Sequence, residues 1–126
     1  MRAVDTNVLL RLITRDDATQ VAAAERFVES GAWISHLVLA ETAWVLDSIY
    51  GLGPAQVAAA LDMLVAHRTL TVEAPEVVAV ALGQFRKRPS LGFSDCLIIE
   101  IARKAGHLPV GTFDRNLGKL DGVQRL

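Results

Sequence analysis

Apolar residues recur along the chain with two different periods, and turn residues separate the segments. Apolar positions spaced by three or four predict helices, and short runs of alternating or continuous apolar residues predict strands. Glycine or proline marks most of the boundaries. Strands are expected at residues 2–5, 33–35, 69–72, 109–113 and 123–126, and helices at 6–14, from 16 or 17 to 31, 36–50, 54–64, 75–88 and 94–105.

The predicted strands alternate with predicted helices from one end of the chain to the other. This order favours a parallel sheet covered by helices on both faces. We therefore expect an α/β fold, a three-layer α/β/α sandwich with a mainly parallel central sheet, formed by residues 1–126 as a single domain. Thr6 is the expected N-cap of the first helix, and Trp33 and Trp44 are expected in the core.

The composition limits the possible partners. Hydrophobic residues make up 52% of the 126 residues and charged residues 21%, which is typical of a globular protein. The formal net charge is -1, so overall charge does not make the chain a nucleic-acid binder, and any such contact needs a local patch. The single cysteine, Cys96, excludes an intrachain disulfide and a multi-cysteine zinc site and suits a reducing compartment.

No apolar run approaches the length of roughly 18 residues that a membrane span needs. No basic and apolar leader precedes the first predicted strand. These observations predict a soluble protein of the cytoplasm.

Four acidic residues stand at positions where open α/β sheets bind ligands. Asp5 and Asp114 each follow a predicted strand, so both are expected at the same edge of the sheet. Asp95 lies in the first turn of the helix 94–105. Glu41 is the only acid in the first two turns of a very apolar helix, where a charge is costly unless something compensates it.

Each of these acids also has a structural interpretation. Asp95 would interact favourably with the dipole of its own helix. Asp5 and Asp114 would form local hydrogen bonds in turns after strands. Glu41 would lie with Asp47 on a narrow solvated stripe of its helix.

The four acids together suggest more than their separate interpretations. Several carboxylates in one crevice repel one another strongly unless a cation lies among them. Magnesium or manganese is the natural cation, because such ions prefer oxygen ligands. An ion in that position can polarise a phosphodiester and activate a water molecule to attack it, which is the chemistry of a metal-dependent nuclease.

The arrangement of these residues resembles the PIN-domain ribonucleases, and among them the VapC-type toxins of toxin–antitoxin pairs. The segment from Asp5 to Leu9 is similar to the opening motif of the family. Ser35 with Glu41 is similar to the second motif. The other two motifs are similar to Phe93-Ser94-Asp95 and to Thr112-Phe113-Asp114 with Gly122-Val123.

The resemblance implies that Asp5, Glu41, Asp95 and Asp114 form an acidic pocket for one or two Mg²⁺ or Mn²⁺ ions. Asp5 and Asp95 would be direct ligands, with Glu41 and Asp114 farther out or at a second ion. Three polar residues would orient these acids or the attacking water, namely Thr6, Asn7 and Thr112. The resemblance further implies endoribonuclease activity on RNA, a homodimer, and inhibition by a small antitoxin protein.

Two other functions fit some of the same residues. A magnesium-dependent phosphotransfer receiver or phosphatase also carries acids at strand ends, but it needs an early acid pair, whereas Asp5 stands alone. A catalytically inactive PIN-like module would bind only RNA or a partner. The basic run from Arg86 to Arg88, like Arg11 and Arg15, would grip an RNA backbone or simply form a solvated helix end.

Overall fold

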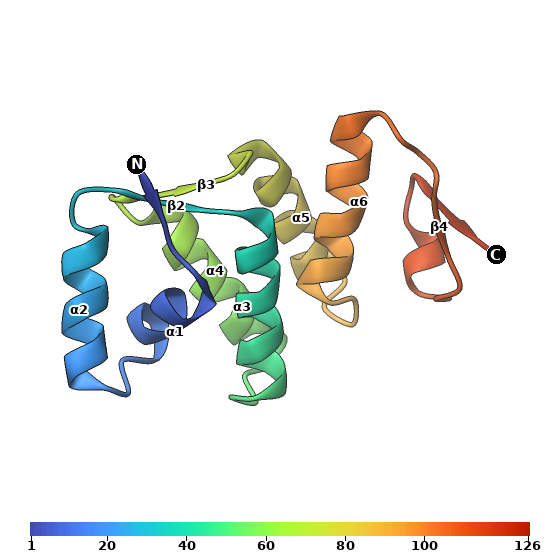
Figure 1. Ribbon diagram of the computed structural model, residues 1–126. Helices are drawn as coiled ribbons and strands as arrows, with labels where there is room; N and C mark the ends of the chain where they lie inside the picture. Colours follow the sequence, from blue (N-terminus) through green and yellow to red (C-terminus); the bar gives the residue numbers. More distant parts are fainter. The chain divides into compact units, whose positions relative to one another are not determined.

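The computed structural model describes residues 1–126, and its contacts group them into two units, Met1–Pro75 and Glu76–Leu126 (Figure 1). The first unit contains three strands and four helices. The fifth helix lies in the second unit except for its first residue, Pro75. The elements in chain order are β1 (Arg2–Ala3), α1 (Thr6–Thr14), α2 (Ala18–Val28), β2 (Ala32–Ile34), α3 (His36–Ser48), α4 (Pro54–Ala66), β3 (Leu70–Val72), α5 (Pro75–Lys87), α6 (Phe93–Ala105), β4 (Val110–Thr112), the 3-10 helix η1 (Leu117–Lys119) and β5 (Val123–Arg125).

The sheet of the first unit is parallel and has the strand order β1-β2-β3. Arg2 pairs with Ala32 in β2, and Ala32 pairs in turn with Leu70 in β3. In β2 and β3 the side chains alternate between buried and exposed, because successive residues of a strand point to opposite faces.

Side chains at the helix starts accept hydrogen bonds from free backbone amides. Asp5 caps α1, Asp17 caps α2 and Ser35 caps α3, and each accepts from the amide three residues later. The prediction that Thr6 caps the first helix is therefore wrong. Thr6 is the first helical residue, and its hydroxyl forms a different hydrogen bond.

The core of the first unit consists of aliphatic side chains from β2, α1, α3 and α4. Leu9, Ile34, Leu39, Leu46 and Leu61 are completely buried. The prediction that both tryptophans belong to the core is wrong. Trp33 is the outward-facing residue of β2, and Trp44 is 58% exposed on α3.

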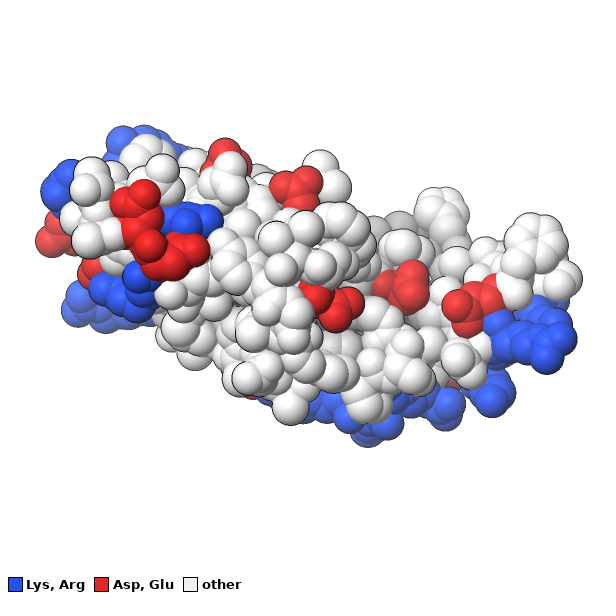
Figure 2. Space-filling model, turned by 90° about the horizontal axis from the view of Figure 1, so that it is seen from below, with Lys and Arg blue, Asp and Glu red and all other residues white.

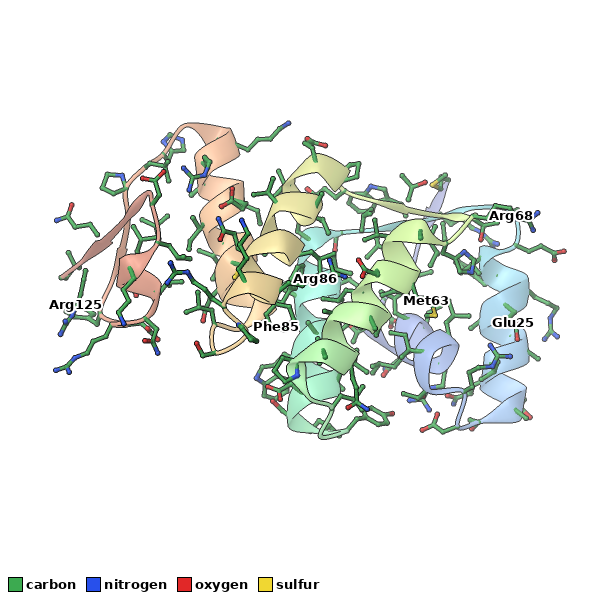
Figure 3. The ribbon with its side chains drawn as sticks, turned by 180° about the vertical axis from the view of Figure 1, so that it is seen from behind. Glu25, Met63, Arg68, Phe85, Arg86 and Arg125 are labelled. Carbon is green, nitrogen blue, oxygen red and sulfur yellow. The ribbon has the colours of Figure 1, made fainter.

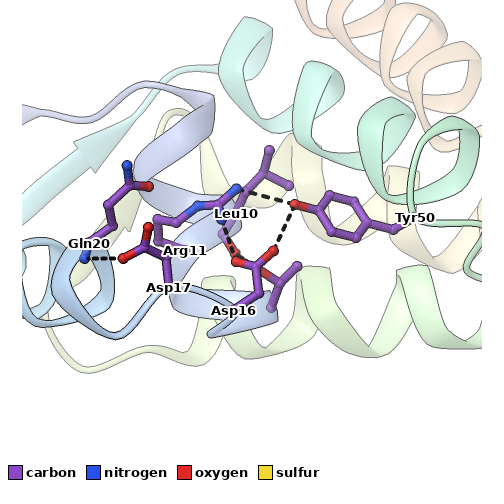
Figure 4. Close-up of polar contacts among 7 residues, drawn as sticks. Leu10, Arg11, Asp16, Asp17, Gln20 and Tyr50 are labelled. Carbon is purple, nitrogen blue, oxygen red and sulfur yellow. Dashed lines mark hydrogen bonds and ion pairs between the residues drawn. The ribbon is translucent and has the colours of Figure 1, made fainter.

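A polar network joins the end of α1 to the end of α3 (Figure 4). Arg11 pairs with Asp16 and also donates to the hydroxyl of Tyr50 at 3.2 Å. The hydroxyl of Thr14 donates to Asp16 at 2.9 Å, and this bond, with the charge of Arg11, lowers the pKa of Asp16. The network thus fixes the turn between α1 and α2.

The second unit packs α5 against α6 and ends in a two-stranded parallel sheet, β4-β5. The rings of Phe85 on α5 (Figure 3) and Phe93 on α6 meet edge to face, with centroids 6.3 Å apart. The buried Glu100 of α6 is compensated by Arg103, which also donates to the backbone oxygen of Asp121 at 2.8 Å. This arginine fixes the turn before β5.

The α/β class and the parallel pairing of the strands are confirmed. The strand pairs are described within each unit, β1-β2-β3 in the first and β4-β5 in the second. At the ends of the second pair, the amide of Val110 donates to the oxygen of Gly122, and the amide of Leu126 donates to the oxygen of Thr112. No helix is both long and apolar enough to cross a membrane.

Two leucines of α3 provide a matched test of this core. Leu39 is 0% exposed and Leu37 is 77% exposed. We expect Leu39→Ala to lower the free energy of unfolding by about 2–5 kcal/mol, because it removes buried contacts and leaves a cavity. Leu37→Ala should change it by no more than about 0.5 kcal/mol. Urea denaturation measures both, and equal effects would contradict the assignment of the buried face.

Candidate active site

Asp5 lies between β1 and α1, with its carboxylate at the helix start. Its Oδ1 accepts a hydrogen bond from the amide of Val8 at 3.2 Å. No protein group hydrogen-bonds to Oδ2, and the residue is exposed. One carboxylate oxygen therefore serves the fold, and the other is available to a ligand.

Thr6 connects the first of the acids to the second. It is buried, and its Oγ1 donates a hydrogen bond to Glu41 Oε1 at 2.5 Å. Because Thr6 directly follows Asp5, this bond ties the beginning of α1 to the middle of α3. A charge-assisted hydrogen bond of this kind holds a carboxylate in one orientation.

Glu41 lies on an exposed and otherwise apolar stretch of α3. Leu37, four residues earlier, and Trp44, three residues later, share its helical face. Both apolar side chains are exposed, at 77% and 58% respectively. Glu41 thus accepts a hydrogen bond from Thr6, and within the first unit no Lys, Arg or His forms an ion pair with it.

Asp95 and Asp114 form the second group of acids, in the unit Glu76–Leu126. Asp95 lies in the first turn of α6, and Asp114 follows β4. Partial burial raises the pKa of Asp95, and the nearby negative charge of Asp114 raises it further. Two carboxylates that repel each other in this way make a favourable position for a cation.

A tight turn holds Asp114 in place. Its Oδ1 accepts hydrogen bonds from the amides of Asn116 at 2.8 Å and Leu117 at 2.9 Å. Its own amide donates to the hydroxyl of Thr112 at 3.1 Å. Thr112 therefore contacts the backbone of Asp114, and Oδ2 of this carboxylate has no protein partner.

The predicted acids thus fall into two pairs, one in each unit. Asp5 is linked to Glu41 through Thr6, and Asp95 is influenced by Asp114. Within neither unit do three or more His, Cys, Asp or Glu side chains gather at one point. The convergence of all four acids on one ion stays a prediction.

Asn7 contacts none of these acids through a hydrogen bond. It lines an apolar groove of about 360 Å³ between α1 and α2, together with Val8, Arg11 and Phe27. Its predicted role in orienting the acids therefore stays untested.

Sequence reasoning missed one feature of the second unit. Two residues of the basic run, Lys87 and Arg88, line a cavity with Lys119 and Asn116. The run itself was the signal in the sequence. Nothing in the sequence connects that run to Lys119, because only the fold of η1 brings the two together.

A model of the PIN domain family matches residues 2–123, a range that includes all four acids. The chain belongs to the PIN domain family. No curated protein matches it significantly in sequence. A solved structure, that of the VapC20 toxin of Mycobacterium tuberculosis, described as cleaving the sarcin-ricin loop, is similar to the chain over 98% of both, with 20% sequence identity and a TM-score of 0.44.

The cysteine of this PIN domain lies directly beside one of the acids. Cys96 is buried, and burial raises the pKa of its thiol to about 11, with smaller contributions from the charges of Asp95 and Glu100. The thiol is therefore protonated at neutral pH. Cys96 is thus a free, buried thiol of the core.

We expect Cys96 of the folded PIN domain to react very slowly with a disulfide reagent at pH 8, because the thiolate is the reactive form. The rate should rise as the pH approaches about 11, where the thiol ionises. Absorbance of the released reporter measures the rate, with protein unfolded in urea as the control. Rapid reaction of the folded protein at pH 8 would contradict both the burial and the raised pKa.

Proposed function

We propose that this PIN domain is a divalent-metal-dependent endoribonuclease and the toxin of a VapC-type toxin–antitoxin pair. The family match over residues 2–123 carries the proposal, because it spans Asp5, Glu41, Asp95 and Asp114. Nuclease activity on RNA agrees with this family. The assignment to the toxins rests on the motif resemblance of the same residues.

The donor set fits a hard divalent ion. All four candidate ligands are carboxylates, and Mg²⁺ and Mn²⁺ prefer oxygen ligands. The raised pKa of Asp95 supports this assignment, since a cation near Asp95 and Asp114 would relieve the repulsion that raises it. We assign Asp5 and Asp95 as direct ligands, and Glu41 and Asp114 as outer ligands or ligands of a second ion.

When bound, the ion would lower the pKa of a water molecule and offset charge on the phosphate. The residues of the chain would orient the reactants. Asp5 would present Oδ2, because Oδ1 is occupied by the amide of Val8. Thr6 would hold Glu41, and Thr112 would hold the turn that carries Asp114. Asn7 is proposed to orient the acids or the attacking water.

The proposal includes two protein partners. A small antitoxin would inhibit the enzyme, and two copies of the chain would form a homodimer. Both partners are implied by the VapC-type motifs at Asp5, Glu41, Asp95 and Asp114. Gel filtration of the chain with and without a co-expressed antitoxin would test them.

Asp5→Asn is the sharpest test of the nuclease. Asparagine caps a helix about as well as aspartate, so the substitution retains the cap of α1 and removes the charge. We expect it to reduce RNA cleavage by roughly 100-fold or more, as loss of a group that organises charge at an active site does. The assay uses purified protein, freed of any partner, with total cellular RNA in magnesium, manganese or EDTA.

Asp17→Asn is the matched control, because Asp17 caps α2 through the same kind of hydrogen bond, at 3.0 Å to the amide of Gln20. The Asp17→Asn variant should cleave RNA as the unaltered chain does, and EDTA should stop cleavage by both proteins. Equal activity of the two variants would refute the role of Asp5. Absence of cleavage by protein that still binds metal would favour an inactive binding module.

Asp95→Asn should separate the metal from the fold. Because its pKa is raised in the folded protein, ionised Asp95 lowers the free energy of unfolding at neutral pH. This destabilisation disappears as the pH falls and Asp95 becomes protonated. Without metal at pH 7, the variant should therefore unfold at the same temperature as the unaltered chain or a higher one. Added Mg²⁺ should raise the unfolding temperature of the unaltered chain only.

Lowering the pH should weaken the effect of Mg²⁺, because protons compete with the ion for Asp95. The raised pKa places this competition at higher pH than for an ordinary aspartate. Differential scanning fluorimetry measures both effects. An equal Mg²⁺ shift in the two proteins would exclude Asp95 as a ligand.

A further inference from the structure

A basic cavity of about 300 Å³ lies in the second unit, between the end of α5 and η1. Lys87 and Arg88 contribute from one side, and Lys119 from the other. Ser90 and Asn116 add side chains that can donate hydrogen bonds, and Pro89 and Leu91 complete the lining. No acidic residue lines this cavity.

The three cations of the cavity are unpaired. Lys87, Arg88 and Lys119 are exposed, and none of them forms an ion pair with a carboxylate. Like charges brought together repel one another, and an anion between them removes that cost. By contrast, Lys104 in the same unit pairs with Glu76 at 2.5 Å.

Both walls of the cavity are anchored in the core of the unit. The turn after α5 is closed by a hydrogen bond from the amide of Leu91 to the oxygen of Arg88 at 3.0 Å, and the side chain of Leu91 is buried. On the other wall, Leu117 and Leu120 are buried on either side of Lys119. The basic side chains therefore extend from fixed backbone.

The cavity lies next to the acids of the same unit. Asn116 lines it, and the amide of Asn116 donates to the carboxylate of Asp114. On the other wall, Leu91 lies one residue before Gly92, the N-cap of the helix that carries Asp95. One turn on each wall therefore connects the cavity to the acids of this unit.

We propose that Lys87, Arg88 and Lys119 form a binding site for the phosphodiester backbone of single-stranded RNA. Arginine forms paired hydrogen bonds to phosphate oxygens, and lysine contributes a point charge. Contacts to phosphates position a nucleic acid without reading its sequence. Because the net charge of the chain is -1, RNA binding would need such a local site. Figure 2 shows Lys and Arg in separate clusters, with large areas of uncharged side chains elsewhere.

The choice of RNA as the ligand rests on the proposed nuclease function, but the binding test does not depend on RNA cleavage. The full chain is titrated in EDTA against a fluorescently labelled single-stranded RNA, and anisotropy gives the Kd at several salt concentrations. The test variant combines Lys87→Ala, Arg88→Ala and Lys119→Ala. The control combines Arg26→Ala, Arg68→Ala and Lys104→Ala, which remove the same charge from exposed positions elsewhere.

We expect the test variant to bind RNA roughly 10-fold to 100-fold more weakly than the control. The slope of log Kd against log salt should fall by about 2, since each phosphate contact on a single strand contributes about 0.7. Circular dichroism confirms that both variants fold. Equal affinity and equal slope in the two variants would overturn the proposal. It would also be overturned if the test variant bound RNA normally but no longer bound an acidic protein partner.

The outcome also distinguishes this site from the nuclease. Weakened RNA binding in the test variant, together with no cleavage by any protein, would support the phosphate site and reject the enzyme. Unchanged RNA binding with cleavage lost only in Asp5→Asn would support the enzyme and reject the phosphate site.

Discussion

Backbone amides at the beginning of a helix and in a turn hold two of the four acids on which the proposed function depends, Asp5 and Asp114. A helix start leaves amides without partners, and a carboxylate satisfies one and gains from the helix dipole. Asp5 does this for Val8, and Asp114 for Asn116 and Leu117. In both residues Oδ1 forms these bonds and Oδ2 has no protein partner. The orientation of these two carboxylates is therefore set by the backbone of the turn that follows each of them.

In the second unit the acidic side chains and the basic side chains form two neighbouring but separate groups. Burial and the charge of Asp114 raise the pKa of Asp95. On the far side of the turn that begins at Asp114, Lys119 joins Lys87 and Arg88 around the cavity. A cation is favoured at the first position and an anion at the second. A metal ion and an RNA backbone together satisfy both requirements.

Local sequence signals predicted the elements well. Helical periodicity placed the helix Thr6–Thr14, and Gly106 marked the end of α6, because these boundaries depend on neighbouring residues alone. Long-range features were harder to predict. The pairing of β2 with both β1 and β3 depends on which segments meet in space, and periodicity does not specify this. The prediction that Trp44 lies in the core fails for the same reason, because the sequence of an apolar helix does not show which of its faces is covered.

The candidate site shows the same limit, and it also shows why the acids need more than a structural explanation. Asp17 demonstrates that capping a helix is reason enough for an aspartate. Asp5 differs because its neighbour Thr6 is buried and donates to a second acid, Glu41. Glu41 caps nothing and lies between exposed apolar residues, so no structural requirement of α3 explains its charge. A carboxylate that is oriented by Thr6 but has no structural role in α3 supports the proposal that Glu41 serves the metal site.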